Sequence, residues 1–473
     1  MARNASFLAG ATIVSRLLTF GLGVVIARHL GAADYGRYGV AIAVATMLLP
    51  LADLGTTPYL SREAARDRAL ADRLALRLAA VRSATSIGLA LAVALGASAL
   101  VGDDRTALAI VLVLVATLAD GTSQFAFGYF QGRERMGFEA LTTSAAALLR
   151  TVGGVVLAVG TGRLIPVLAW MVGVSLLQLV VTGTRLWRAV ERPEERTERA
   201  GPDWRTVVAM GLIGVFVMVY LRADTVMIGW LLDETEAGLY TAAYTIMSSL
   251  QIVPWMVALA LTPVFARSHG RDDALFRRSW HEGLRTVLVV ALPLALVAAV
   301  LAGPIVERVF GGEYDRSAST LAIIVWSCPV ASMNVLMAAV MRGAGREGWL
   351  TAASGAGAVL NVGLNVWAIR AFGIAGAAAT TITTEVVVLV GLAAVAVHFG
   401  VVGAPRLPVV RMAGALGVLA VAAVVSEPLP VEARGVLALA AYGAAALGLR
   451  VVGTGDLDRL RSAARRRGPT GVG

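Results

Sequence analysis

Residues 7–30 read FLAGATIVSRLLTFGLGVVIARHL, an almost uninterrupted apolar run at the start of the chain. A helix rises about 1.5 Å per residue, so about 20 apolar residues cross the ~30 Å hydrocarbon layer of a membrane. Thirteen comparable runs follow, which gives expected spans at 7–28, 38–59, 80–101, 106–130, 138–160, 164–184, 206–231, 237–266, 284–307, 317–341, 348–369, 373–398, 407–425 and 434–450. The sequence therefore predicts an all-α polytopic membrane protein with 14 transmembrane helices.

Composition favours a membrane protein over a soluble one. Apolar residues make up 58% of the 473 residues, and all 41 basic residues are arginine. In a soluble chain, a net charge of +10 would suggest that the protein binds nucleic acid. Here we expect the positive charge to face anionic membrane lipids, and we expect no nucleic-acid partner. The absence of lysine excludes a phosphate-binding P-loop and Schiff-base catalysis. The four histidines are dispersed, so we expect no cofactor and no metal site.

The arginines are distributed asymmetrically between the two sets of loops. Of the 41, 29 lie in or beside the termini and the loops that follow even-numbered spans, and eight lie in or beside the other loops. The remaining four, Arg16, Arg82, Arg150 and Arg222, fall within spans. The positive-inside rule then predicts a multi-pass plasma-membrane protein with cytoplasmic N- and C-termini.

The two halves of the chain resemble each other. Gly36-Arg-Tyr38 after span 1 matches Gly238-Leu-Tyr240 after span 7, and residues 131–138 match residues 342–349 at a similar offset. Two matches at compatible offsets indicate duplication of a six-span unit. We expect two pseudo-symmetric six-helix lobes around a central cavity, plus two C-terminal helices. The expected divisions are an N-terminal lobe at 1–185, a cytoplasmic linker at 186–205, a C-terminal lobe at 206–399, spans 13 and 14 within 400–452, and a basic cytoplasmic tail at 453–473.

Several short motifs carry a family resemblance. In chain order they are LGAADYGRY at 30–38, LADLG at 51–55, DTVMIG at 224–229, AGLYTAAY at 237–244, LTP at 261–263, FGGEY at 310–314 and FGIAGAAA at 372–379. Together they resemble the oligosaccharide flippases of polysaccharide biosynthesis, of the O-antigen and teichoic-acid exporter type. That family belongs to the multidrug/oligosaccharidyl-lipid/polysaccharide transporter superfamily.

The resemblance implies a function without catalysis. It implies a flippase that moves a polyprenyl-pyrophosphate-linked oligosaccharide from the inner to the outer leaflet by alternating access, for cell-surface polysaccharide biosynthesis. Its partners would be the lipid-linked oligosaccharide, membrane lipids, a coupling ion (H⁺ or Na⁺), and glycosyltransferases or a polymerase of the same pathway. A lipid II flippase and an ion-coupled multidrug exporter remain alternatives within the superfamily. A membrane glycan polymerase or ligase is disfavoured, because no expected outer loop is long.

Charged residues inside the first lobe are the first site candidates, because each costs ~2.5–3.5 kcal/mol to insert. Arg16 in span 1 and Asp53 in span 2 either pair with each other, or Arg16 grips a pyrophosphate in the cavity. Asp120 and Arg150 fall at nearly equal depth on consecutive antiparallel spans. We expect these two to neutralise each other and to fasten the first lobe. Arg82 lies near the expected membrane edge and is given no role.

Further candidates lie in the second lobe. Arg222 and Asp224 are two positions apart on one helix and so point to different sides. Glu385 in span 12 is the expected partner for Arg222. Asn361 and Asn365, one turn apart, offer a polar stripe for sugar hydroxyls or for bonds between helices. The full set of candidate substrate-binding residues is Arg16, Asp53, Asp120, Arg150, Arg222, Asp224, Asn361, Asn365 and Glu385.

The predicted topology can be tested by cysteine labelling in a Cys328→Ser background. Single cysteines at Asp104, Glu234 and Gly312 should react with an impermeant maleimide added outside intact cells. Cysteines at Ala69, Glu195 and Ala464 should react only after the cells are permeabilised. Labelling at Glu195 from outside would invert the linker between the halves and overturn the assignment.

Overall fold

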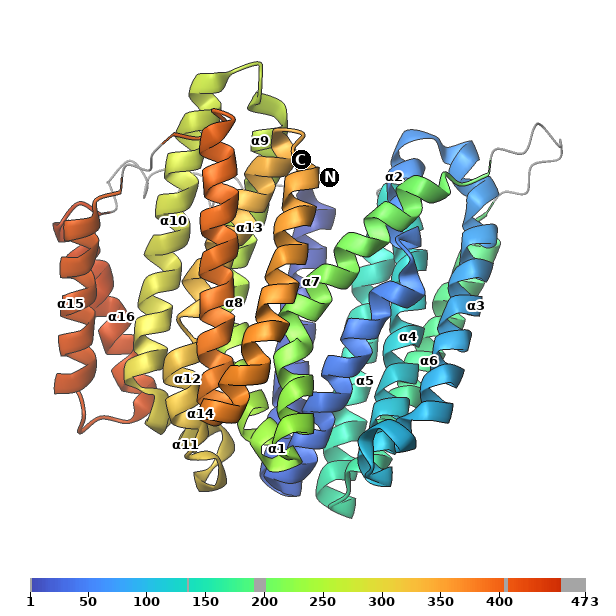
Figure 1. Cartoon of the computed structure of the whole chain (residues 1–473), viewed down its shortest axis with the longest axis horizontal. Helices are drawn as coiled ribbons and strands as arrows, with labels where there is room; N and C mark the ends of the chain where they lie inside the picture. Colours follow the sequence, from blue (N-terminus) through green and yellow to red (C-terminus); the bar gives the residue numbers. More distant parts are fainter. Residues whose placement is uncertain (1, 134–135, 191–200, 404–406, 452–473) are drawn as a thin grey trace, which may run out of the picture. The chain divides into compact units, whose positions relative to one another are not determined.

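The computed structural model describes residues 2–133, 136–190, 201–403 and 407–451. The regular structure within these ranges is helical and contains no strand, which confirms the expected all-α class (Figure 1). The elements are α1 (Ala2–Asp53), α2 (Thr56–Arg66), α3 (Arg68–Val101), α4 (Asp104–Gly132), α5 (Gly137–Thr161), α6 (Leu164–Ala189), α7 (Trp204–Leu231), α8 (Glu234–Ala260), α9 (Thr262–Ser268), α10 (Asp273–Val300), α11 (Ala302–Phe310), η1 (Gly312–Tyr314), α12 (Ser317–Ile324), α13 (Ser327–Gly343), α14 (Glu347–His398), α15 (Val409–Val425) and α16 (Val431–Gly448).

The helices account for the fourteen expected spans. Eleven helical stretches of the described chain are long and apolar enough to cross a membrane, and α15 is a shorter apolar helix. Two of the eleven, within α1 and α14, join a pair of spans across a kink. Counting each kinked stretch as two and adding α15 gives fourteen spans.

Glycines with positive φ angles form the two kinks. Gly31 has φ 84° within α1, and Gly373 has φ 61° within α14. Side chains other than glycine rarely adopt this left-handed region, so these two residues allow the chain to turn between spans without a long loop. A third break follows span 2, where Leu54 and Gly55 both have positive φ.

The third break corrects one boundary derived from the sequence. Span 2 ends at Asp53, not at residue 59, because the backbone leaves the helix at Leu54. The segment between spans 2 and 3, residues 62–77, is divided between two helices. Its first part ends α2 at Arg66, and its second part begins α3 at Arg68, with Asp67 extended between them.

Aspartates begin three of the helices. Asp103 accepts hydrogen bonds from backbone amides at the start of α4, Asp203 does so for α7, and Asp272 does so for α10. Such caps satisfy amides that have no partner within the helix. The pKa of Asp103 is lowered mainly by a hydrogen bond from the Thr106 hydroxyl. The pKa of Asp203 is lowered mainly by a hydrogen bond from the Thr206 hydroxyl.

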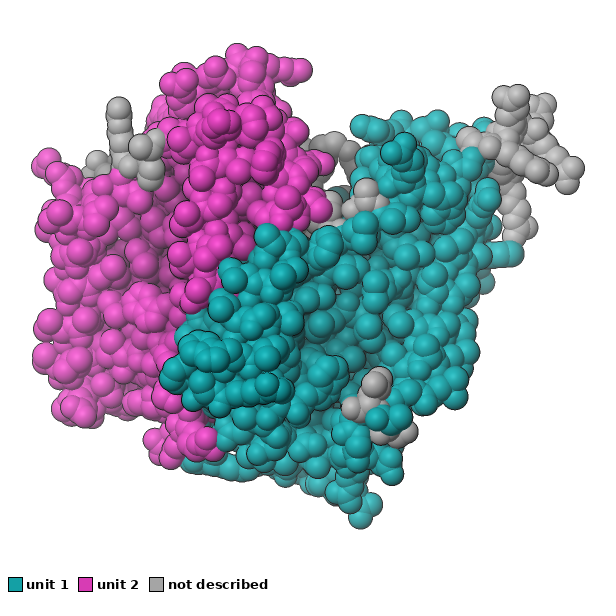
Figure 2. Space-filling model, viewed as in Figure 1, with its two compact units in different colours: residues 1–245, 310–314, 354–380 teal, residues 246–309, 315–353, 381–473 magenta. Residues whose placement is uncertain are grey.

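The chain divides into two compact units (Figure 2). Unit 1 comprises residues 1–245, 310–314 and 354–380, and unit 2 comprises residues 246–309, 315–353 and 381–473. Their boundaries fall inside α8, α11 and α14 and directly after η1. The lobes expected from the sequence, 1–185 and 206–399, stay a prediction. Half of the expected linker (residues 191–200) and all of the expected tail (residues 453–473) lie outside the described residues.

Unit 1 brings together the glycines that mark the two sequence repeats. A Cβ atom added to Gly36 would lie 1.7 Å from the carbonyl oxygen of Glu234 and 2.8 Å from the amide nitrogen of Gly238. A Cβ atom added to Gly238 would lie 2.0 Å from the carbonyl oxygen of Ala32. The backbones of α1 and α8 thus touch at equivalent positions of the two repeats, as small residues permit between membrane helices.

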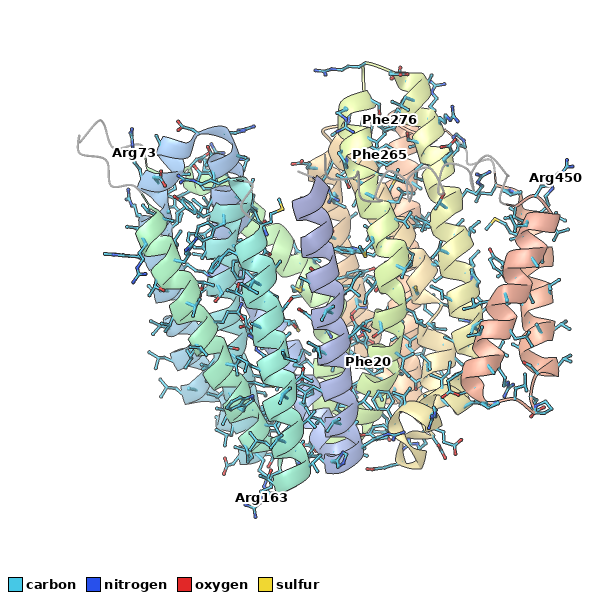
Figure 3. The ribbon with its side chains drawn as sticks, turned by 180° about the vertical axis from the view of Figure 1, so that it is seen from behind. Phe20, Arg73, Arg163, Phe265, Phe276 and Arg450 are labelled. Carbon is cyan, nitrogen blue, oxygen red and sulfur yellow. The ribbon has the colours of Figure 1, made fainter. Side chains whose placement is uncertain are left out.

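Two labelled arginines mark the two ends of the helices of unit 1. Arg73, near the start of α3, and Arg163, just before α6, lie at opposite ends of the unit (Figure 3). The sequence assigns these arginines to loops on opposite sides of the membrane.

Unit 2 contains the last two spans. Helices α15 and α16 pack against each other and against α10. The Tyr442 hydroxyl of α16 donates a hydrogen bond of 3.1 Å to the carbonyl oxygen of Val289 in α10. At one end of the unit, the rings of Phe265 and Phe276 pack edge to face, 5.3 Å apart (Figure 3).

The close glycine contact predicts a steric requirement. Gly36→Ala should destabilise the protein by at least ~1–3 kcal/mol, because the added methyl group meets backbone atoms that cannot rotate away. Gly21→Ala is the matched control, since nothing lies within 4 Å of its Cβ position. Fluorescence-detected size-exclusion chromatography after heating would compare them. Equal melting temperatures for Gly36→Ala and the parent would contradict the observed packing.

Candidate functional site

Asp53 and Arg82 form a buried ion pair at the break after span 2. Arg82 Nη1 lies 3.0 Å from Asp53 Oδ1, and the Arg82 side chain is only 1% exposed. The same carboxylate accepts hydrogen bonds from the Thr57 amide at 3.3 Å and from the Thr57 hydroxyl at 2.5 Å. Asp53 therefore neutralises a buried arginine and also caps the start of α2.

This pair corrects the sequence analysis in two respects. Asp53 binds Arg82, and not Arg16 as one of the two alternatives had it, so Arg82 is not an edge residue without a role. Depth along an apolar run gave no sign of the pairing, because the run continues through the break at Leu54. Arg16 itself is exposed on α1, among exposed apolar neighbours such as Leu17.

Asp120 and Arg150 are brought together as the sequence predicted. Arg150 Nη2 donates to Asp120 Oδ1, and also to Gln178 Oε1 at 3.1 Å. The three residues come from α4, α5 and α6, so the arginine links three consecutive spans. The side chains of Arg150 and Asp120 remain 22% and 32% exposed. Sequence analysis missed Gln178, although a glutamine inside an apolar span is itself a signal.

Asp224 and Arg222 use different partners, as their spacing on α7 requires. Asp224 is 2% exposed and accepts from the Tyr240 hydroxyl at 2.5 Å and from the Thr225 amide at 2.6 Å. Arg222 lies with its guanidinium carbon 4.9 Å from the centre of the Tyr244 ring. Both tyrosines come from the repeat motif at the start of α8, where the sequence gave them no role in the site.

The two asparagines of α14 bond to each other within one helix. Asn365 Nδ2 donates to Asn361 Oδ1 at 3.0 Å, and both side chains are buried. The Asn365 Oδ1 atom has no hydrogen-bond partner among the described residues. The expected polar stripe is thus present, with one acceptor left over inside unit 1.

Glu385 lies in unit 2 and has a partner in that unit. Asn334 Nδ2 donates to the Glu385 carboxylate at 2.5 Å and to its carbonyl oxygen at 3.0 Å. Asn334 was missed by the sequence analysis. Glu385 and Arg222 belong to different units, so their pairing stays a prediction.

No ligand set for a metal is apparent in the described part of the chain. The described residues contain no group of three or more histidine, cysteine, aspartate or glutamate side chains that could hold an ion. The polar groups inside the spans instead form separate pairs and small clusters.

Fourteen apolar spans with paired charges inside them define a polytopic membrane protein. The sequence profile of the polysaccharide biosynthesis protein family matches residues 1–269, which is more than half of the chain. The chain therefore belongs to this family. The profile of a second family, MatE, matches residues 209–367.

One curated relative is similar over part of the chain. It is the "Probable low-salt glycan biosynthesis flippase Agl15" of Haloferax volcanii, which is 22% identical over 273 residues. The aligned region spans 57% of each chain.

Solved structures share the fold over nearly the whole chain. An inward closed conformation of the lipid II flippase MurJ has a TM-score of 0.74 at 14% identity and covers 93% of this chain and 97% of its own. An inward-facing multidrug resistance MATE family transporter of the MOP superfamily has a TM-score of 0.63 at 16% identity and covers 82% and 94%. These likenesses confirm the expected superfamily fold.

The Asp53–Arg82 pair predicts a non-additive effect of mutation. Asp53→Asn leaves a buried guanidinium without its counter-charge and should cost ~3–5 kcal/mol. Adding Arg82→Met, which removes that guanidinium, should restore much of the loss. Thermal unfolding of purified single and double variants would measure the coupling. Additive losses would show that the two side chains do not stabilise each other.

Proposed function

We propose that the protein is a flippase that moves a polyprenyl-pyrophosphate-linked oligosaccharide from the inner to the outer leaflet, without catalysis of its own. The observation that carries the proposal is the placement of arginine on the first helix of each repeat, in a transporter fold. Arg16 is exposed on the first span of α1, and Arg222 is partly exposed on α7. Family membership and the resemblance to a glycan biosynthesis flippase support the choice of substrate class.

The chemistry of the substrate requires such groups. A pyrophosphate carries more than one negative charge, and moving it away from water is prohibitive unless cations compensate. A guanidinium offers two parallel donors that match phosphate oxygens, which the ammonium of lysine cannot reproduce. Two arginines at roughly equivalent places in the repeats, though not at equal depth, could bind the headgroup in turn as it moves.

Alternating access is supported by the contacts around the first kink. The Glu313 carboxylate accepts from the Ala32 amide at 2.8 Å, and the Tyr314 hydroxyl donates to the Ala27 carbonyl oxygen at 3.1 Å. These bonds hold residues 312–314 against the corner between spans 1 and 2. We propose that they, together with the contact between Gly36 and Gly238, close the outer side and separate during transport.

Two alternatives share parts of this proposal. A lipid II flippase would also carry a polyprenyl pyrophosphate, and the likeness in fold to MurJ favours it, so the two functions differ in the glycan. A multidrug exporter of cations is disfavoured by the intramembrane arginines. A proton or sodium gradient as the driving force, and glycosyltransferases or a polymerase as partners, are also proposals. So is a plasma-membrane location with cytoplasmic termini.

Reconstituted protein tests the role of the arginines. Arg16→Ala and Arg222→Ala should each slow the appearance of a lipid-linked glycan in the opposite leaflet about tenfold or more, as expected for losing a hydrogen bond to a charged group. Arg16→Lys should also be slow, because it keeps the charge but loses the planar fork. An outer-leaflet glycan probe on liposomes would measure the rates.

The matched control is Arg163→Ala, which removes an exposed arginine just before α6. It should transport at the parental rate. Normal transport by Arg16→Ala protein would exclude the role proposed for this arginine. If glycan length changes while leaflet exposure does not, the protein is a polymerase and not a flippase.

A further inference from the structure

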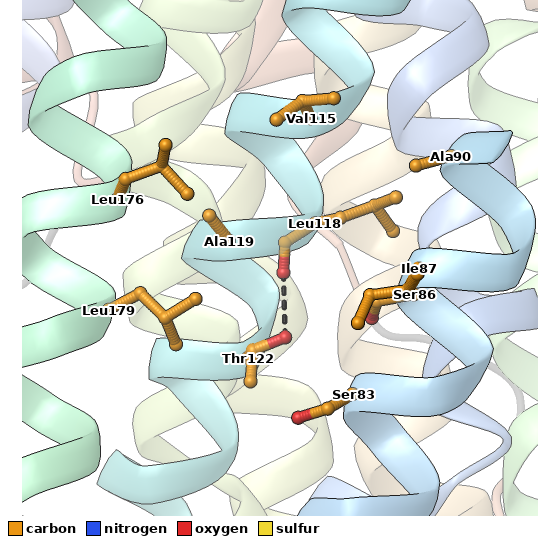
Figure 4. A pocket seen from close by; sticks show the side chains of 10 residues that line it. All are labelled: Ser83, Ser86, Ile87, Ala90, Val115, Leu118, Ala119, Thr122, Leu176 and Leu179. Carbon is orange, nitrogen blue, oxygen red and sulfur yellow. Dashed lines mark hydrogen bonds between the residues drawn. The ribbon is translucent and has the colours of Figure 1, made fainter. Parts of the chain in front are cut away.

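Helices α3, α4 and α6 of unit 1 form an apolar groove away from the residues considered above. Helix α4 packs against both α3 and α6 and forms its floor. The groove contains a cavity of about 220 Å³ (Figure 4). Ile87 and Leu176 are exposed at its rim. The residues that line it are Ser83, Ser86, Ile87, Ala90, Val115, Leu118, Ala119, Thr122, Leu176 and Leu179.

Hydroxyl groups gather at one end of this groove, where Ser83, Ser86 and Thr122 lie (Figure 4). Thr122 donates to the Leu118 carbonyl oxygen at 2.8 Å, a bond drawn in Figure 4. Ser86 is 7% exposed, and its Oγ has no hydrogen-bond partner among the described residues. A hydroxyl buried without a partner is costly, so an acceptor supplied by a ligand would stabilise this site.

Arginines lie beyond the same end of the groove. On α3, Arg77 is exposed six residues before Ser83, which corresponds to roughly 9 Å along the helix. Arg73 is exposed one turn further on and lies at this end of unit 1 (Figure 3). On α6, Arg188 is exposed near the helix terminus on the same side. Cations, then hydroxyls, then apolar side chains follow one another along the membrane normal.

We propose that this groove binds one acyl chain of an anionic glycerophospholipid, taken from the leaflet at the N-terminal end of α3. The order of the groups matches the phosphate, the ester carbonyls and the acyl chain of such a lipid. Ser86 donates to an ester carbonyl oxygen, and Arg73, Arg77 and Arg188 attract the phosphate. A polyprenyl chain has no ester carbonyl and would leave Ser86 unsatisfied. The site does not depend on the proposed transport function.

Photolabelling of the full-length protein in nanodiscs tests this site. The probe is phosphatidylglycerol with a diazirine in one acyl chain, and labelled peptides are mapped by mass spectrometry. Peptides of α3, α4 and α6 should be labelled in the parent protein. Ala90→Leu fills the groove and should abolish this labelling. Ser86→Ala removes one hydrogen bond and should reduce it roughly two- to tenfold.

The matched control is Ala84→Leu, the same substitution on an exposed position of α3. It should label like the parent, and so show that Ala90→Leu acts by filling the groove. Equal labelling of Ala90→Leu and Ala84→Leu would overturn the site. Equal labelling by a phosphatidylcholine probe would overturn the anionic headgroup, and stronger labelling by a photoreactive polyprenyl phosphate would replace the phospholipid with an isoprenoid.

Discussion

Backbone groups at a break in a helix lose their partners along the helix, so other groups must satisfy them. The kink at Gly31 leaves the Ala27 carbonyl oxygen at the end of one span and the Ala32 amide at the start of the next. Tyr314 and Glu313, almost 300 residues away in sequence, bind these two groups. The break at Leu54 is satisfied in the same way by Asp53, which binds the amide of Thr57. The kinks are therefore defined features of the fold.

Close packing of helix backbones explains why the duplicated glycines meet. Between helices in a membrane, close packing replaces the hydrophobic effect as the source of association, and it is strongest where backbones approach. Gly36 and Gly238 allow that approach at equivalent positions of the two repeats. Gly55 repeats the pattern against α7, where its Cβ would lie 2.1 Å from the Val207 carbonyl oxygen. Because this contact is made by uncharged backbone atoms, separating the two helices there would break no ion pair.

Sequence predicted the spans and the local relations well, because both follow from helix geometry. Asp120 and Arg150 lie on consecutive straight helices, so equal depth along each apolar run was enough to pair them. Asn361 and Asn365 are one turn apart and duly bond to each other. The failures involve helices that are not consecutive or not straight. Arg82 binds Asp53 across a break that the apolar pattern does not show, and Asn334 binds Glu385 between spans 10 and 12. Those pairings depend on tertiary packing, which the position of a residue within its own span does not encode.

The charged residues within the spans are of two kinds, which differ in how far their side chains are buried. Arg82 is almost wholly buried against Asp53, so an arriving anion would have to break a buried pair to reach it. Asp224 is likewise enclosed, with Thr225 and Tyr240 on its carboxylate oxygens. Arg16 differs from both in exposure, because its side chain is exposed within an apolar span, where a charge is costly. Our proposal therefore places the substrate's charge at Arg16, whose side chain is exposed, and not at Arg82, whose guanidinium is buried against Asp53.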